Sequence, residues 1–367
     1  MSIDLARFTE LGLASGLETL GVQITMISPG EISDAPFNHI VVKKVRFPGL
    51  ETLSAAREIS RLLSSDSSLI GDADLILVDW RYVKPLGSIL KNSTIKWAII
   101  DRGPPATSGI KGGRIRKELL RNLQKRYWRD AWRIASQYSV GGFVVSKEHG
   151  NLVGSVIDGN MGLYRLPAGT DQNQYMDRKT DPSSHLNLAY VGRVDKKRGL
   201  GRIGNLSTAL DEIGLSHSIS IIGEGDLSSN IALQSGGNSN IVYLGQLGHE
   251  ETLRLLAKQH VGILPMPGIA VWRISSPIKL AEYAASGLAV IGPKHSGNIL
   301  DKDGDWSMLS ENSDWTQDCA TMLAGKIRDG NWQEEIVEGA LQASRDYHWD
   351  VIAEGMAGNI QEMISLQ

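Results

Sequence analysis

A set of cationic and hydroxyl side chains in the second half of the chain could bind a diphosphate. The segment GILPMPGIAVWRISSPIKLAEYAASGLAVIG has the pattern of a buried strand, a loop, a short helix and a second strand. We expect a serine to cap this helix and a proline to occupy its first turn. Backbone N–H groups at a helix start attract anions, and nearby cations strengthen that attraction. The residues predicted at this site are Arg273, Ser275, Ser276, Pro277, Ile278 and Lys279.

Glu282 follows Lys279 by about one helical turn. Its carboxylate could accept two hydrogen bonds from the vicinal hydroxyls of a ribose. The alternative is that Lys279 and Glu282 form only a solvated ion pair, which is common at this helical spacing.

Two turns that follow strands could complete a nucleotide site. In YVGRVDKKRG a strand is followed by a basic turn, whose guanidinium groups could hold phosphate oxygens. In IIGEGDL two glycines would let a base or ribose approach the backbone. The alternatives are a solvated basic loop and an ordinary glycine turn. The residues predicted here are Gly192, Arg193, Lys197, Arg198, Gly223 and Gly225.

In the first half, KWAIIDRGPPATSGIKGG places Asp101 and Arg102 just after a strand. A rigid turn at Pro104–Pro105 and a glycine-rich loop follow. We expect Asp101 to orient an acceptor or act as a base, and Arg102 to contact an anion. The alternative is that Asp101 only caps the loop.

The segment from Lys111 to Arg133 is strongly basic, with nine basic and two acidic residues. Its apolar residues keep helical spacing, which predicts one apolar face. Such a helix, over residues 111–134, could lie on an anionic membrane surface. The alternative is a core helix with a solvated basic face. The residues of the expected apolar face are Leu120, Leu123, Tyr127, Ala131 and Ile134.

The elements that must position these side chains are strands alternating with helices. The 367 residues suit two domains, and the alternation predicts an α/β fold with two doubly wound parallel sheets. A helical segment over residues 5–20 precedes the first strand, and a polar linker follows residue 169. We therefore place an N-terminal domain at 1–170, a second domain at 171–347 and a closing helix at 348–367.

Composition excludes several other classes of function. The net charge of −3 gives no overall attraction to nucleic acid. Cys319 is the only cysteine, and no Cys/His cluster or calcium-loop spacing indicates a metal site. No apolar run reaches the roughly 20 residues of a membrane span, and the opening segment lacks the pattern of a secretory signal. We expect a cytoplasmic protein, with peripheral association at the cytoplasmic membrane face as a further expectation.

The ordered motifs YVGR…KRG, IIGEGD, NIVYLGQLGHEETLRLLAKQHVGILPMP and SSPIKLAEYAASGLAVIG resemble the donor domain of family-4 GT-B glycosyltransferases. LPAGTD and DYHWDVIAEGM continue the resemblance, which covers about residues 140–360. It implies two Rossmann-like domains facing a cleft and a C-terminal helix that crosses back to the first domain. It also implies retaining, metal-independent transfer from a UDP- or GDP-linked sugar, with no cofactor, to a glycan or lipid-linked acceptor.

By this resemblance, Arg193 and either Arg198 or Lys197 hold the donor diphosphate, and Glu282 holds the ribose. The amides near Ser276 hold the distal phosphate. With no protein nucleophile implied, stabilising the departing diphosphate is the main catalytic task, which falls to Arg193, Arg198 and Lys279. One position departs from the family, because Ile274 stands where the first of two glutamates, eight positions apart, is usual.

Three alternatives remain open from the sequence. The first is a non-catalytic subunit that binds a nucleotide sugar. The second is a sugar-nucleotide epimerase of the same fold. The third is a nicotinamide-dependent oxidoreductase, although GEGDLSS has only two of the three glycines of a dinucleotide fingerprint.

Overall fold

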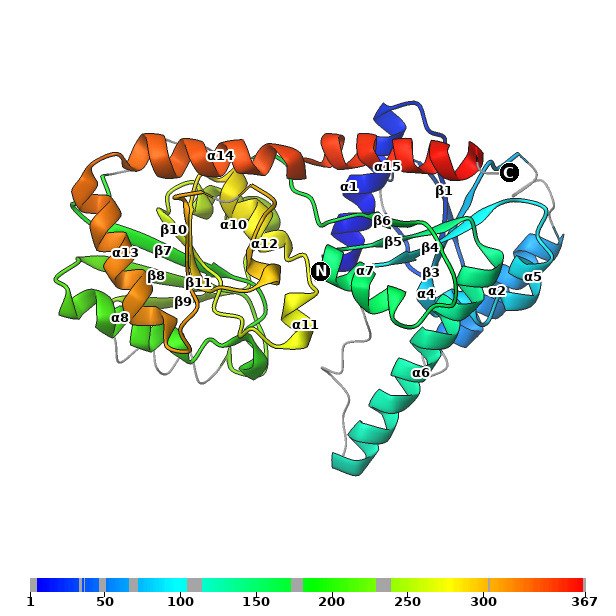
Figure 1. Cartoon of the computed structure of the whole chain (residues 1–367), viewed down its shortest axis with the longest axis horizontal. Coiled ribbons are helices and arrows are strands. Elements are labelled where there is room, and N and C mark those ends of the chain that lie inside the picture. Colours follow the sequence, from blue (N-terminus) through cyan, green and yellow to red (C-terminus); the bar gives the residue numbers. More distant parts are fainter. Residues whose placement is uncertain are drawn as a thin grey trace. The chain divides into compact units, whose positions relative to one another are not determined.

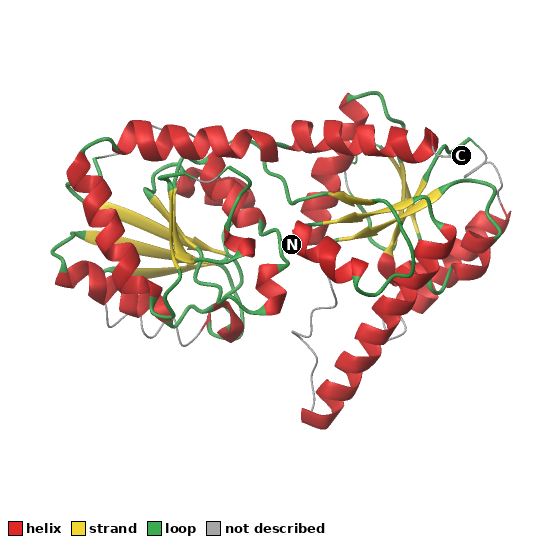
Figure 2. Cartoon of the chain, in the orientation of Figure 1, coloured by secondary structure: helices red, strands yellow, loops and turns green. Residues whose placement is uncertain are grey.

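The computed structural model of the chain describes residues 5–32, 35, 37–45, 51–65, 72–103, 114–172, 181–228, 239–302 and 304–365. The chain divides into two compact units, one of residues 1–167 and 349–367 and one of residues 168–348. Each unit is built on parallel strands flanked by helices (Figures 1 and 2). The predicted α/β class is confirmed.

Unit 2, residues 168–348, contains a six-stranded parallel sheet in the order β12-β11-β10-β7-β8-β9. The order reverses direction between β7 and β10, which is the topological switch point of a doubly wound sheet. Its strands are β7 (Leu186–Val191), β8 (His217–Ile222), β9 (Ile241–Gly245), β10 (Val261–Ile263), β11 (Ala289–Pro293) and β12 (Ser307–Ser310).

Helices cover this sheet because its central strands β7, β10 and β11 are largely buried apolar runs. The helices are α8 (Arg202–Glu212), α10 (His249–Leu256), α11 (Ala270–Arg273), α12 (Ile278–Ala285), α13 (Trp315–Asp329) and α14 (Gly339–Ser344). A π-helix spans Trp332–Glu338. Short 3₁₀ turns occupy Lys196–Arg198, Ser296–Asn298 and Arg345–Tyr347.

Unit 1 contains a four-stranded parallel sheet in the order β3-β4-β5-β6 and a separate parallel pair, β1-β2. The strands are β1 (Thr25–Ser28), β2 (Asn38–Val41), β3 (Ile76–Asp79), β4 (Trp97–Asp101), β5 (Gly141–Val144) and β6 (Leu163–Arg165). The helices are α1 (Leu5–Thr19), α2 (Glu51–Ser65), α4 (Trp80–Val83), α5 (Gly87–Lys91), α6 (Arg114–Tyr138), α7 (Lys147–Gly154) and α15 (Trp349–Ser365).

The closing helix α15 packs on α1 within unit 1. Glycines on α1 allow this close approach. A Cβ at Gly12 would lie 2.5 Å from the Trp349 ring, and one at Gly16 would lie 2.6 Å from the Ala353 Cβ. The last helix of the chain therefore belongs to the same core as the first.

Two predicted segments fall partly or wholly outside the described residues. The Pro104–Pro105 turn and glycine-rich loop lie in 104–113, and much of the expected linker lies in 173–180. The boundary between the two units lies between residues 167 and 168, close to the boundary predicted at residue 170.

Candidate functional site

The switch point of unit 2 brings together the segments that follow β7 and β10. Ligands bind in such sheets at the carboxyl ends of the strands on either side of a switch point. Gly192 to Arg198 follow β7, and α11 and α12 follow β10. The predicted basic turn and the predicted anion site therefore belong to the same edge of one sheet.

Three of the predicted glycines are explained by close packing of the backbone. Gly192 and Gly223 both have positive φ, and a Cβ at Gly223 would lie 1.9 Å from the Gly192 carbonyl oxygen. A Cβ at Gly225 would lie 2.4 Å from Asp195 Oδ1. Whether these glycines also contact a ligand stays a prediction, but the fold alone requires them.

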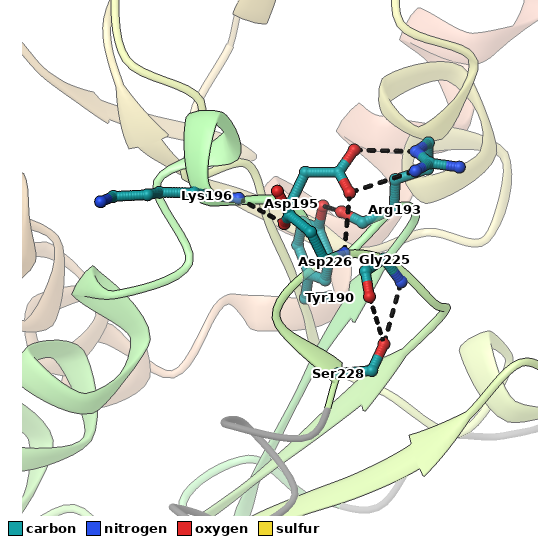
Figure 3. Close-up of polar contacts among 7 residues, drawn as sticks. All are labelled: Tyr190, Arg193, Asp195, Lys196, Gly225, Asp226 and Ser228. Carbon is teal, nitrogen blue, oxygen red and sulfur yellow. Dashed lines mark hydrogen bonds and ion pairs between the residues drawn. The ribbon is translucent and has the colours of Figure 1, made fainter. Parts of the chain in front are cut away.

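Arg193 is held by a carboxylate in its own turn (Figure 3). Its Nε lies 2.8 Å and its Nη2 3.2 Å from the two oxygens of Asp195. This bidentate pair raises the pKa of Arg193. Asp195 also accepts from the Asp226 N–H, and Asp226 accepts from the Lys196 N–H, so two successive turns are joined.

Lys279 is the most unusual charged group of the site. Its side chain is 8% exposed, and its Nζ has no hydrogen-bond partner among the described residues. The ammonium lies 4.4 Å from the centre of the Tyr190 ring, and a Cβ at Gly192 would lie 3.2 Å from it. Lys279 therefore points from α12 to the carboxyl end of β7.

Burial, followed by the positive charge of Arg198, lowers the pKa of Lys279 well below its usual value. Glu282 acts in the opposite direction. A buried cation without a hydrogen bond is costly, so the site favours an anion that would satisfy it.

Arg198 is the second cation near Lys279. Its guanidinium carbon lies 4.9 Å from the centre of the Trp272 ring, and the Trp272 indole donates to the Lys197 carbonyl at 3.1 Å. Arg198 also acts on Tyr190, where it partly offsets the burial that raises the pKa of that phenol to about 12. Trp272 thus orients Arg198, while the side chain of Lys197 is exposed.

The start of α12 differs from the prediction. Pro277 is the N-cap, and no side chain caps the helix. The prediction of a serine cap was wrong because both hydroxyls have other partners. Ser276 Oγ accepts from the Ala168 N–H at 3.0 Å, and Ser275 Oγ donates to the Trp272 carbonyl at 2.7 Å. Ile278 is the first helical residue.

Arg273 ends α11, and its side chain is exposed. Its charge contributes to the lowered pKa of His295, although burial is the larger cause. His295 is buried, accepts from the Gly297 N–H and bonds the Met266 carbonyl, so it holds the loop after β11. The structure thus places Arg273 close enough to act on His295.

Glu282 lies one turn after Lys279 on α12 and is partly exposed. Burial raises its pKa to about 7, and the attraction to Lys279 opposes this shift. The pair is therefore not the solvated surface pair of the alternative interpretation. A carboxylate with this pKa can accept hydrogen bonds from a diol when it is ionised.

In unit 1, Asp101 is 1% exposed and lies at the end of β4. One oxygen accepts from the Trp128 and Trp132 indoles at 2.6 and 2.9 Å, and the other accepts from the Gly103 N–H at 2.9 Å. His149 Nε2 lies 3.4 Å away. The base-like role expected of Asp101 stays a prediction, but these partners favour a structural role.

Arg102, next to Asp101, donates to the Leu166 carbonyl at 3.1 Å. Burial lowers its pKa to about 10, although the carboxylates of Glu10 and Asp101 act in the opposite direction. A guanidinium with two carboxylates nearby is partly neutralised. Its role as an anion contact stays a prediction.

The residues that orient the cations were not predicted from the sequence. Tyr190 lies under Lys279, Trp272 lies against Arg198, and Asp195 holds Arg193. The spacing Arg-x-Asp in GRVDKKRG was a visible signal for a local ion pair. Nothing in the sequence predicted that Trp272, 74 positions from Arg198, would pack on it.

No family model matches the chain, and no curated protein matches it. Solved structures do match over almost the whole chain. Sucrose-phosphate synthase from Thermosynechococcus elongatus has a TM-score of 0.70 at 13% identity, covering 99% of this chain and 94% of that one. WaaG, a glycosyltransferase of lipopolysaccharide biosynthesis, has a TM-score of 0.67 at 13% identity, covering 98% and 97%.

Anabaena HepE, solved in complex with UDP, has a TM-score of 0.64 at 14% identity, covering 93% of this chain and 100% of that one. These neighbours are GT-B glycosyltransferases, so the predicted GT-B fold is confirmed. Identities this low establish the fold and leave substrates to the chemistry of the site.

Proposed function

We propose that this protein is a retaining, metal-independent glycosyltransferase that uses a nucleoside-diphosphate sugar. The observation that carries the proposal is the ammonium of Lys279, buried at the switch point of unit 2 without a hydrogen-bond partner among the described residues. A fold shared with glycosyltransferases supports the same conclusion.

The site suits a diphosphate because its cations are oriented before a ligand binds. Lys279 and Arg198 act on each other as like charges, and in the described part of the chain neither forms the bidentate carboxylate pair that Arg193 forms with Asp195. Two such cations favour a ligand with at least two negative charges. In the transfer reaction they would stabilise the charge that develops on the departing diphosphate, in the place of a metal ion.

The remaining donor contacts follow from position. The exposed Arg193 would contact phosphate either while it stays bound to Asp195 or after that ion pair breaks. The backbone near Ser276 and Ile278 would face the distal phosphate. Glu282 would hold the ribose diol. The acceptor would be a glycan or a lipid-linked sugar.

The proposal is tested by incubating the full chain with UDP- and GDP-linked hexoses and measuring release of the free nucleoside diphosphate. We expect release with one donor, stimulated by a sugar acceptor and insensitive to EDTA. NMR of the product should show the anomeric configuration of the donor. Release that requires a divalent metal, or an inverted product, would contradict the proposal.

A non-catalytic nucleotide-sugar-binding protein is the second candidate, and the observation that favours it is Ile274. This residue caps α11 with an apolar side chain at the position where the family usually has a carboxylate. Nucleotide binding with no release from any donor, with or without acceptors, would select this candidate.

The exposed first half of helix α6 supports a proposal about membrane contact. The apolar residues near its end are buried, as Ala131 is, but Leu119 and Leu123 are 59% and 53% exposed. The expected apolar face is therefore buried only towards the end of the helix, and the first half of α6 extends away from the rest of unit 1 (Figure 1). We propose that this half lies on an anionic membrane.

Two variants test this membrane contact. Changing Leu119 and Leu123 together to Ser should reduce sedimentation with vesicles containing phosphatidylglycerol, since both burial of leucine and attraction of the basic residues contribute. The control changes Leu53 to Ser, because this leucine on α2 is also exposed, at 50%. Equal sedimentation of both variants and wild type would contradict the contact.

Among the described residues, no helix is long and apolar enough to span a membrane.

A further inference from the structure

A cavity of about 400 Å³ lies in unit 2, away from the switch-point site. Residues 304–306, which line it, come directly before β12, and β12 runs parallel to β11. The cavity is therefore at the amino ends of the strands, whereas the candidate donor site is at their carboxyl ends. The π-helix and α14 supply its other described walls.

The deepest described part of the cavity is the edge of an indole ring. Trp306 is 2% exposed, and its N–H donates no hydrogen bond to another described residue. A Cβ at Gly304 would lie 3.1 Å from Trp306 Cδ1 and 3.4 Å from Nε1, and one at Gly339 would lie 3.5 Å from Cδ1. Both glycines line the cavity. Because neither has a side chain, the N–H edge of the ring can be reached from the cavity.

Ion pairs hold the walls in place. Lys326 Nζ lies 3.2 Å from Asp305 and 2.7 Å from Glu335, so it ties the residues before β12 to the π-helix. Lys302 lies 2.7 Å from Asp346, which ties the same loop to the turn after α14. The walls are therefore ordered before any ligand binds, which lowers the cost of binding.

The π-helix is a second observation that points to a ligand. It spans Trp332–Glu338, and π-helices are rare and frequent at functional sites. Glu335 lies within it and Gly339 directly follows it, and both line the cavity. The irregular turn thus places a carboxylate and an open glycine position side by side on one wall.

The polar groups of the cavity favour an uncharged ligand with several hydroxyls. Lys326 is shared by two carboxylates and Lys302 has one of its own, so the charges are already paired. Carboxylate oxygens accept, the Trp306 N–H donates, and the Gln342 amide does both. A hydroxyl also donates and accepts, so it can bond to each of these groups. The buried Ala343 and the indole edge suit the apolar C–H face of a sugar ring.

We propose that this cavity binds one neutral sugar residue of a glycan, at a site separate from that of the nucleotide. Asp305, Glu335 and Gln342 would bond to its hydroxyls, and the Trp306 N–H would donate to one of its oxygens. The inference goes beyond the proposed function and does not depend on it. Such a site would hold a glycan by a residue remote from any reacting end.

The test is NMR of the full chain labelled with ¹⁵N at its tryptophan indoles, titrated with the methyl glycosides of glucose, galactose and mannose. The chain has nine tryptophans, and Trp306→Phe identifies the signal of Trp306. We expect a saturable shift of this signal with at least one neutral glycoside, and weaker responses to glucuronate and choline, which are charged. Saturating UDP or GDP should leave the response unchanged, because the nucleotide would bind at the opposite edge of the sheet.

Two variants locate the binding. Gly339→Leu should abolish the response, because the new side chain fills the cavity while the backbone, at φ −59° and ψ −45°, stays helical. Gly355→Leu makes the same change on α15, where a Cβ would meet nothing within 4 Å, and should respond as wild type does. Gln342→Ala should weaken binding by about fivefold, because one hydrogen-bonding group is lost.

Circular dichroism establishes that each variant is folded. Gln342 is exposed, so Gln342→Ala tests the site even if Gly339→Leu does not fold. The inference is overturned if no neutral glycoside shifts the Trp306 signal, if a charged probe binds more tightly, or if a nucleotide abolishes the response. It is also overturned if Gln342→Ala, or a folded Gly339→Leu, responds as wild type does. Binding of UDP or GDP in the same samples reports separately on the proposed function.

Discussion

At the scale of single residues, the two arginines after β7 have different environments. Arg193 is bound by both oxygens of Asp195, whereas Arg198 packs on the Trp272 ring and acts on Lys279. Binding a ligand anion is easier for a cation that no carboxylate holds in a bidentate pair. We therefore infer that Arg198 contributes more to nucleotide binding than Arg193 does.

Arg198→Ala should weaken binding of the cognate nucleoside diphosphate by about tenfold or more, while Arg193→Ala should weaken it by about threefold or less. Isothermal titration calorimetry of the two variants measures both effects. The ranking is contradicted if Arg193→Ala has the larger effect.

The raised pKa of Glu282 makes a prediction about stability. Between the ordinary value of 4.5 and about 7, the folded protein keeps a proton that the unfolded chain has lost. The stability due to this group is therefore present at low pH and falls as pH rises through this window. The fall is at most about 3 kcal/mol, and the partial exposure of the side chain reduces it.

Urea unfolding of wild type and Glu282→Gln at pH 5 and pH 7.5 measures this effect. We expect the variant to lose less stability than wild type over this interval, because its amide does not titrate. Equal losses in the two proteins would show that the Glu282 pKa is not raised.

At the scale of elements, one carboxylate joins three parts of unit 1. Asp101 ends β4, and it binds Trp128 and Trp132 on α6 and lies 3.4 Å from His149 on α7. Its Gly103 contact also fixes the first residues after the strand. This buried network explains how the second half of α6 is anchored while its first half extends outward.

Asp101→Ala should lower the free energy of unfolding by about 2–5 kcal/mol, since two buried indole N–H groups lose their acceptor. Urea unfolding followed by tryptophan fluorescence measures the loss. Asp130→Ala is the control. Asp130 also lies on α6, but it forms only an exposed ion pair with Lys84, so the variant should lower the free energy of unfolding by less than about 1 kcal/mol. Similar losses in both variants would contradict the network's role.

The strands with long apolar runs could be predicted from the sequence, and β7, β8, β10 and β11 lie where those runs occur. Strands β6 and β12 could not, because their sequences, LYR and SMLS, contain no apolar run. The basic and anion-binding segments were found from residue types near strand ends. Their details depend on tertiary contacts, such as that of Ser276 with Ala168, which no local pattern contains.

At the scale of the whole molecule, the small net charge does not describe the charge at individual sites. The chain carries a net charge of only −3, yet unit 2 has at its switch point a buried cation with no hydrogen-bond partner among the described residues. We propose that this local charge, rather than the net charge of the chain, is what attracts a diphosphate.

Calorimetric titration of the full chain and of Lys279→Met with UDP, GDP, ADP and NAD tests most sharply whether Lys279 binds a nucleoside diphosphate. We expect wild type to bind UDP or GDP and Lys279→Met to bind it about 100-fold more weakly, because a buried charge-assisted contact is removed. Lys258→Met, at an exposed lysine of the same unit, should bind as wild type does. If Lys279→Met binds the nucleotide as tightly as wild type, or if NAD alone binds, Lys279 does not hold a donor diphosphate.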